Sequence, residues 1–182
     1  MPEALMAGRD SGESLQDLAY LGREFLTWLL FHVDQGEDTF GKGDEAFAVA
    51  FCGRVRLKAL AGDVTDAALK GGTAAYGVET RAALGAGRSL REAELRISRG
   101  DREWRCVLEA DTLDLKSVKL PALLSEEDDD RFLERMSLLE ELDQMVRVAL
   151  CEFLHRRARP AWQRSEVPAI RKWLADALRV EG

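Results

Sequence analysis

The chain has 182 residues, of which 46% are hydrophobic and 32% are charged, and its formal net charge is −7. This length corresponds to one ordinary domain, and the hydrophobic content excludes a chain that is disordered throughout. The acidic balance excludes a protein that coats nucleic acid with its whole surface, but it permits a local basic face.

The first 13 residues contain four charged side chains among small residues. They lack the apolar core of a secretory signal, so we expect a disordered tail. The most apolar run, residues 25–33, is too short to cross a bilayer of roughly 30 Å, and we expect no membrane partner. Three cysteines, Cys52, Cys106 and Cys151, lie far apart without a C-x-x-C motif. We therefore predict reduced thiols in a cytoplasmic protein.

A first helix is predicted from Ser14, a plausible N-cap, because apolar residues follow at helical spacing. From Phe25 to Val33 the helix is apolar on nearly every side, so we expect other elements to cover more than one of its faces. The glycine-rich residues 35–44 end this helix.

Residues from 47 onward change to a period of two, which is typical of strands. Strands are predicted at 47–51, 54–59, 92–97, 103–109 and 113–116, with a further short strand at 64–69 and a modest helix at 74–84. Alternation of apolar and charged side chains predicts an antiparallel sheet with one buried and one wet face. The fold class is therefore α+β, with five to six strands in two meanders, a buried N-terminal helix, a short middle helix and two C-terminal helices.

The longest predicted helix spans residues 128–157, which is about 45 Å of helix. This length suggests that the helix projects, kinks or pairs with another chain, while the single domain as a whole covers residues 14–182. Its apolar stripe includes five candidate interaction residues: Phe132, Met136, Leu139, Val146 and Phe153. Pro160 ends the helix, and a last helix is predicted at about 166–180.

The acidic run 126–130 precedes this long helix. Ser125 is a predicted N-cap, and carboxylates in a first turn stabilise the positive end of the helix dipole. The alternatives are a divalent cation or a basic partner, but the alternating ligands and turn glycine of a calcium loop are missing.

No catalytic motif, phosphate-binding loop or metal-ligand spacing is found. The two histidines, His32 and His155, fall on different predicted helices without nearby ligands. We therefore expect a non-enzymatic protein without cofactor or metal, although an enzyme with a site assembled from scattered residues is an open alternative.

Charge is distributed unevenly along the chain. Residues 110–145 contain eleven acids and four bases, a net charge of −7, whereas residues 146–182 contain eight bases and four acids, a net charge of +4. Two basic groups are candidate phosphate contacts: the strand row Arg54, Arg56 and Lys58, and the helix-end group Arg156, Arg157 and Arg159. Alternatively, the strand row simply faces water, and the helix-end arginines stabilise the negative end of the helix dipole.

Several stretches in order along the chain resemble the C-terminal half of recombination-associated RdgC-like proteins in their longer form. They are Leu21-Gly22-Arg23-Glu24-Phe25-Leu26-Thr27-Trp28-Leu29, Ala82-Ala83-Leu84-Gly85 with Gly87, Arg102-Glu103-Trp104, Lys119-Leu120-Pro121, Leu133-Glu134-Arg135-Met136 and Leu139-Glu140-Glu141-Leu142-Asp143. The resemblance covers most of the chain from about residue 20 and includes no catalytic motif.

This resemblance implies a non-enzymatic protein that binds duplex DNA without sequence preference, as a ring-shaped dimer, and that modulates RecA-type recombination. The N-terminal half of the longer proteins has no counterpart here. If DNA contact or ring closure depends on that half, we expect this chain to retain the fold and to lose the activity. The alternative function is a protein-protein interaction or assembly module that uses the long helix and binds no nucleic acid.

Overall fold

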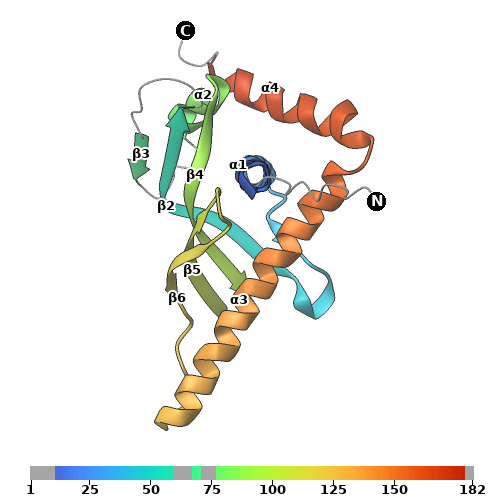
Figure 1. Ribbon diagram of the computed structural model, residues 1–182. Coiled ribbons are helices and arrows are strands. Elements are labelled where there is room, and N and C mark those ends of the chain that lie inside the picture. The colour runs from blue at the N-terminus through green and yellow to red at the C-terminus, as the bar shows by residue number, and fades with distance from the viewer. Residues whose placement is uncertain (1–10, 60–66, 71–76, 179–182) are drawn as a thin grey trace, which may run out of the picture.

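The computed structural model describes residues 11–59, 67–70 and 77–178. It confirms an α+β fold in which helices pack on an antiparallel sheet (Figure 1). In chain order the elements are α1 (Ser11–Asp34), β1 (Thr39–Phe40), the 3-10 turn η1 (Gly43–Glu45), β2 (Phe47–Ala59), β3 (Ala67–Lys70), α2 (Val78–Gly85), β4 (Arg88–Arg99), β5 (Arg102–Glu109), β6 (Leu115–Lys119), α3 (Asp128–Arg157), the π-helical turn η2 (Trp162–Glu166) and α4 (Val167–Leu178).

Within the described residues the sheet has six strands, and its main order is β1-β2-β4-β5-β6, with each of these pairs antiparallel. One edge of β2 pairs with β4, and the other edge pairs with β1 near Phe47 and with β3 at Arg54–Leu57. The period of two in the sequence produces this arrangement, because alternate residues of each strand turn their side chains to the same face.

The core lies between one face of this sheet and the helices α1 and α3. Phe25, Leu26, Trp28, Leu29 and Leu30 of α1 are each at most 1% exposed. They pack against the bulky side of the strands, including Phe51, Leu95 and Trp104. The prediction that α1 is covered on more than one face is therefore confirmed, because its buried residues face several directions around the helix, and Thr27 and Phe31 between them are half-buried.

Helix α1 approaches the end of β5 very closely at Gly22. A Cβ atom on Gly22 would lie 1.8 Å from the carbonyl oxygen of Ala110, so only glycine permits this contact. Beside it, the Arg23 guanidinium donates two hydrogen bonds to the Asp111 carboxylate, at 2.7 Å from Nε and 2.9 Å from Nη2. This bidentate pair fixes α1 against the turn after β5.

The Asp111 pair makes the stability of the protein dependent on pH. The hydrogen bond from Arg23 outweighs partial burial and lowers the pKa of Asp111 below its usual value of 3.8. A carboxyl whose folded-state pKa is lowered stabilises the fold above its unfolded-state pKa, and this stabilisation is lost as pH falls through the folded-state pKa. We expect Asp111→Asn to lower the free energy of unfolding by about 1–2 kcal/mol at pH 7, and this difference should shrink below about pH 3.8. Urea titrations of both proteins from pH 7 to pH 3 measure it, and a difference that stays constant with pH would contradict this account.

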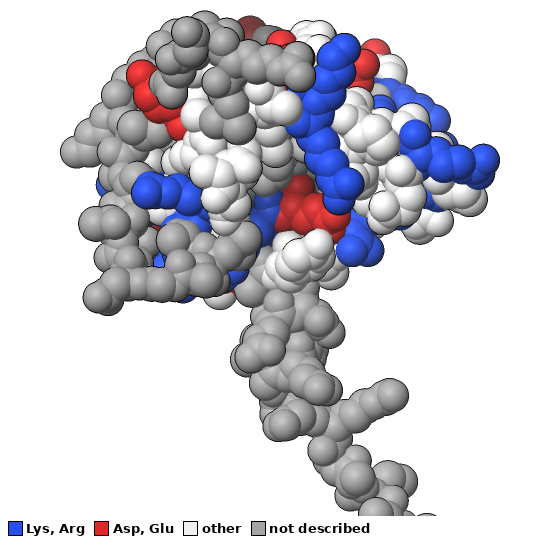
Figure 2. All heavy atoms as spheres, turned by 90° about the horizontal axis from the view of Figure 1, so that it is seen from above, with Lys and Arg blue, Asp and Glu red and all other residues white. Residues whose placement is uncertain are grey.

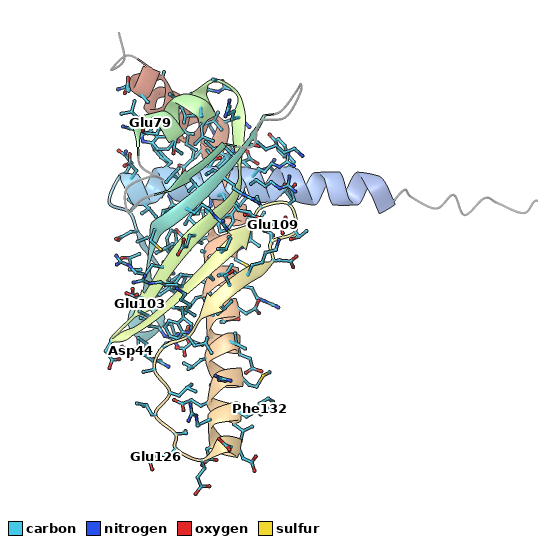
Figure 3. The ribbon with its side chains drawn as sticks, turned by 90° about the vertical axis from the view of Figure 1, so that its left-hand side faces the viewer. Asp44, Glu79, Glu103, Glu109, Glu126 and Phe132 are labelled. Carbon is cyan, nitrogen blue, oxygen red and sulfur yellow. The ribbon has the colours of Figure 1, made fainter. Side chains whose placement is uncertain are left out.

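Helix α3 matches the predicted range, and its first turns, before Leu138, extend beyond the sheet (Figures 1 and 3). The prediction that Ser125 caps it is wrong, because the N-cap residue is Glu127 and makes no side-chain capping bond. The backbone N–H groups of Leu124 and Ser125 instead donate to the carboxylate of Glu134, about two turns into the helix. These bonds lower the pKa of Glu134.

The two strands predicted at 47–51 and 54–59 are wrong as separate elements, because the chain continues through Gly53 as the single strand β2 with a bulge at that residue. Helix α1 begins at Ser11, so residues 11–13 are helical and Ser14 is not its N-cap. The rest of the predicted N-terminal tail lies outside the described residues. The predicted strand at 64–69 and helix at 74–84 are described only in part, as β3 and α2. The last helix is preceded by the π-helical turn η2, which places Trp162 in the core.

Candidate functional site

The sheet face opposite α1 and α3 is open, and no described helix lies over it (Figure 3). Val55 and Leu57 of β2 point into the core, whereas Arg54, Arg56 and Lys58 of the same strand are half-buried and belong to the open face. The strand row predicted from the sequence is therefore on one surface of the folded molecule.

Neighbouring strands add further charged side chains to this face, as the strand register shows. The described cations of the open face number seven against four carboxylates: Arg54, Arg56, Lys58, Arg96, Arg105, Lys116 and Lys119, with Glu92, Glu94, Glu103 and Glu109. This set carries a net charge of +3, from seven positive and four negative groups, on a chain whose total is −7. Only the strand row of this face was identified from the sequence. Arg96 and Arg105 share their strands with glutamates, and the two lysines of β6 lie on a short strand, so neither set forms a basic row in the sequence.

Ion pairs hold several of these cations in place. Arg56 Nη1 lies 3.4 Å from Glu92 Oε2, and Arg105 Nε donates to Glu103 Oε1 at 2.9 Å. The Lys116 ammonium is hydrogen-bonded to the Glu109 carboxylate. Positive and negative side chains are therefore interspersed on this face, with an excess of positive charge. A polyanion that binds there must compete with the carboxylates for the cations.

A β-bulge in β2 shapes the middle of the open face. The register with β4 shifts between Phe51 and Val55, where Gly53 adopts a positive φ of 69°. A Cβ atom at Gly53 would lie 2.1 Å from Glu94 Oε2, so the glycine makes room for this carboxylate. Glu94 accepts a hydrogen bond of 3.2 Å from the Arg54 backbone N–H, which fixes it at the start of the strand row.

The helix-end group lies on the other side of the sheet, and the structure does not bring it together with the strand row (Figure 1). Arg156 donates to Glu152 at 2.9 Å and stacks over Trp28, with 5.7 Å from its guanidinium carbon to the ring centroid. Arg157 donates to Glu24 of α1 at 2.6 Å. Only Arg159 of the three is fully exposed, so two of these arginines tie α3 to the rest of the fold.

Seen from above, basic side chains form a short row across the middle of the upper end of the molecule, beside a group of carboxylates, and further basic side chains lie to either side (Figure 2). The open sheet face gathers seven described cations on one surface, and it is the candidate that we consider for contact with a polyanion.

The candidate interaction residues of α3 fall into two environments. Phe132 is 63% exposed, Met136 44% and Leu139 38%, and all three lie in the first half of the helix. Val146 is half-buried, and Phe153 is fully buried against Phe25, Trp28 and Trp162. Phe153 is therefore a core residue of this chain and is unavailable to a partner.

A polar cluster that the sequence did not reveal surrounds the buried His32 side chain. Its Nδ1 lies 2.6 Å from Oε2 of Glu37, which is largely exposed, and its Nε2 lies 2.5 Å from Glu166 Oε1. Both ring nitrogens are therefore within hydrogen-bond distance of a carboxylate. No local motif signals this group, since Glu166 is 134 positions from His32 in the chain.

Glu166 also accepts a hydrogen bond of 2.9 Å from the Trp28 indole N–H. Burial acts to raise the pKa of Glu166, but the hydrogen bonds from His32 and Trp28 outweigh it and the pKa is lowered. The hydrogen bonds among His32, Glu37, Glu166 and Trp28 connect α1, the loop before β1 and the turn η2. We interpret them as stabilising the fold.

An open groove of about 1010 Å³ runs between α3, η2 and the loop after β1. Its wall carries positive side chains, such as Lys42, Arg147 and Arg159, and negative ones, such as Glu45 and Glu152. Within residues 11–59, 67–70 and 77–178, no three His, Cys, Asp or Glu side chains are grouped so that they could hold a metal ion. This mixture of charges does not define a ligand.

A comparison with models of protein families finds no match to this chain. A search of curated proteins finds no significant match either. Of the described helices, none has both the length and the apolar character required to cross a membrane.

Proposed function

We propose that this protein is a non-enzymatic, cytoplasmic accessory protein, similar to part of the RdgC-like recombination-associated proteins. In this proposal it contacts duplex DNA without sequence preference through the open face of its sheet. The observation that carries the proposal is the excess of cations on that face, seven against four carboxylates.

Physical considerations favour phosphate contact and disfavour base readout. Arginine and lysine side chains that contact phosphates orient a protein on a duplex without reading its sequence. Base readout in the major groove requires a helix or a two-stranded ribbon that enters the groove, and no described helix projects from this face. The negative charge elsewhere on the chain repels DNA, so a duplex approaches the protein on its positive face.

The resemblance supports this proposal through the elements that it covers. Its stretches at 21–29, 102–104 and 133–143 fall in α1, β5 and α3. These elements build the core, so the resemblance supports a common fold more directly than a common activity.

Removing three cations from the open face tests the proposal. We expect Arg54→Ala, Arg96→Ala and Arg105→Ala together to weaken binding of a random-sequence duplex about 10-fold to 100-fold at low salt. The slope of log affinity against log salt should fall by about 3, one for each lost phosphate contact. Fluorescence anisotropy at several salt concentrations measures both quantities.

The matched control removes three exposed arginines elsewhere, by Arg147→Ala, Arg159→Ala and Arg171→Ala. It changes the net charge equally and should retain most of the affinity. Equal losses in the two triple variants, a binding constant independent of salt, or no binding at low salt would refute the proposal.

A second candidate function is an assembly module that binds no nucleic acid. The observation that favours it is the exposed apolar end of α3, where Phe132, Leu133, Met136 and Leu139 are each at least 38% exposed. An exposed apolar patch on a protein surface is commonly a site where another protein binds.

A further inference from the structure

Four apolar side chains gather on the first turns of α3, on the side of the helix away from the core. This group, the α3 patch, consists of Phe132, Leu133, Met136 and Leu139, and all four are exposed. At about 100° per residue they fall within an arc of roughly 120°, and the middle of this arc is about 140° from that of the buried side chains of α3. Figure 3 shows Phe132 on the turns that extend beyond the sheet. This apolar surface is therefore accessible to a partner.

Two carboxylates flank the α3 patch along the helix. Asp129 lies three positions before Phe132, and Glu140 follows Leu139 directly. By the same angular count, both carboxylates lie within the arc of the patch. Both are exposed, and no ion-pair partner of either lies among the residues that the structure describes. Their charges are thus available to a cation that approaches the patch.

The neighbouring cations of α3 do not neutralise these two carboxylates. Arg131 and Arg135 are exposed, but they lie outside the arc of the patch by roughly 80° and 40°. Arg147 is in line with the patch further along the helix, but its Nε lies 2.7 Å from Oδ2 of Asp143, whose charge it balances. The surface thus combines an apolar centre with a negative charge at each end.

A surface of this kind matches one class of partner, a helix that is apolar in its middle and basic at its ends. Asp129 and Glu140 are 11 positions apart. This separation is about 16 Å along the axis, or three turns of a second helix packed alongside. The apolar stripe of such a helix buries the α3 patch, and lysine or arginine side chains at its two ends pair with the two carboxylates.

The same charges disfavour the other occupants of this surface. In a parallel pair of α3 helices Asp129 faces its own counterpart, and in an antiparallel pair it faces Glu140 of the other copy. Both orientations place like charges together, so a second copy is a poor partner. DNA and an anionic membrane are repelled by the same carboxylates.

We propose that the α3 patch binds a basic amphipathic helix of another protein. The apolar stripe of that helix covers Phe132 and Met136, and its terminal cations pair with Asp129 and Glu140. This inference rests on the second candidate function and specifies the chemistry of its partner.

Three fluorescein-labelled helical peptides of about 18 residues, or five turns, test the proposal against the full chain. The first carries a leucine stripe with two lysines at each end, and in the second peptide glutamates replace these lysines. The third has the composition of the first, but its leucines are scattered around the helix. We expect fluorescence anisotropy to give a micromolar dissociation constant for the lysine peptide. Binding of the other two should be at least about tenfold weaker, because the second is repelled and the third has no stripe.

Two double variants of the chain locate the binding surface. Phe132→Ala with Met136→Ala should weaken binding of the lysine peptide at least about tenfold, because its apolar anchors are lost. Asp129→Asn with Glu140→Gln should reduce the advantage of the lysine peptide over the glutamate peptide to about threefold or less.

The matched control is Glu79→Gln with Asp176→Asn. It removes the same charge from exposed positions in α2 and α4, at the opposite end of the molecule from the patch (Figures 1 and 3). We expect it to change neither the affinity nor the preference for the lysine peptide. Circular dichroism verifies that each variant is folded.

The outcomes separate this inference from the second candidate function. Equal affinities for the lysine and glutamate peptides would overturn the basic partner and leave the assembly module standing. If no peptide binds, or if Phe132→Ala with Met136→Ala binds the lysine peptide as the wild type does, the proposal is wrong and the α3 patch no longer supports that function. Loss of self-association or of duplex binding in the same variant would assign the patch to a second copy or to DNA, against the proposal. The DNA-binding test depends on cations of the open sheet face, so the two proposals fail separately.

Discussion

Replacing Phe153 with alanine is expected to lower the free energy of unfolding by about 4 kcal/mol. The Phe153 side chain is fully buried, and its ring centroid lies 5.5 Å from that of Trp28 and 5.6 Å from those of Phe25 and Trp162. These three rings come from α1 and from η2, so the cavity would open where two helices and a turn meet. Rings held on separate elements cannot move together easily to fill the space, which places the expected loss near the upper end of the usual range.

The natural control lies on the same helix. Phe132→Ala removes the same atoms from a side chain that is 63% exposed, and we expect the free energy of unfolding of the isolated chain to change by less than about 0.5 kcal/mol. Urea denaturation followed by tryptophan fluorescence measures both variants, at a protein concentration low enough to exclude association. If the two substitutions destabilise the protein equally, the division of α3 into a packed half and a projecting half is incorrect.

The second large effect is expected for Gly22→Ala. In an ordinary helix this change is stabilising by roughly 0.5–1 kcal/mol, since alanine is the better helix former. Here the new Cβ would lie 1.8 Å from the Ala110 carbonyl oxygen and 2.8 Å from its carbon, and a backbone group cannot rotate away as a side chain does. The helix must shift away from β5, and this shift strains the adjacent Arg23–Asp111 pair. We expect the free energy of unfolding to fall by about 3 kcal/mol.

The control for Gly22→Ala is Gly36→Ala, which tests the cost of replacing a glycine without a steric clash. Gly36 has a positive φ of 80° but open space around the position of a Cβ atom, so only the strain of the left-handed conformation applies. We expect a loss of about 1 kcal/mol there. A Gly22→Ala protein as stable as the wild type would show that α1 does not approach Ala110 this closely in solution.

The sequence predicts most of the fold because its elements have strong periods. The alternation of Val55 and Leu57 with Arg54 and Arg56 identifies both the strand and its two faces, and the structure agrees. Helix α3 is found over its whole length because its apolar spacing continues without interruption from Phe132 to Phe153. The pattern does not separate the buried residues of this helix, such as Leu142, from the exposed ones, such as Met136, because the two sets lie only about 100° apart on the helix surface.

Contacts between segments that are distant in the chain could not be predicted from the sequence. His32 resembles an isolated polar residue until folding brings Glu166 to its Nε2. Gly22 has no local signature, because the carbonyl that requires it belongs to residue 110. The full set of cations on the open face likewise depends on the register of four strands, which sets Arg96 opposite Arg105 and Arg105 opposite Lys119.

The unequal packing of α3 has a consequence for the way this helix opens. From Leu138 onward the helix is anchored by buried side chains such as Leu142, Met145 and Phe153, so breaking hydrogen bonds there requires the core to open. Before Leu138 the helix has no buried side chain, and these turns can unwind at small cost while the rest of the molecule stays folded. Any partner that covers Phe132 and Met136 must therefore also hold those turns in helical form, and part of its binding free energy is spent on their lost conformational entropy.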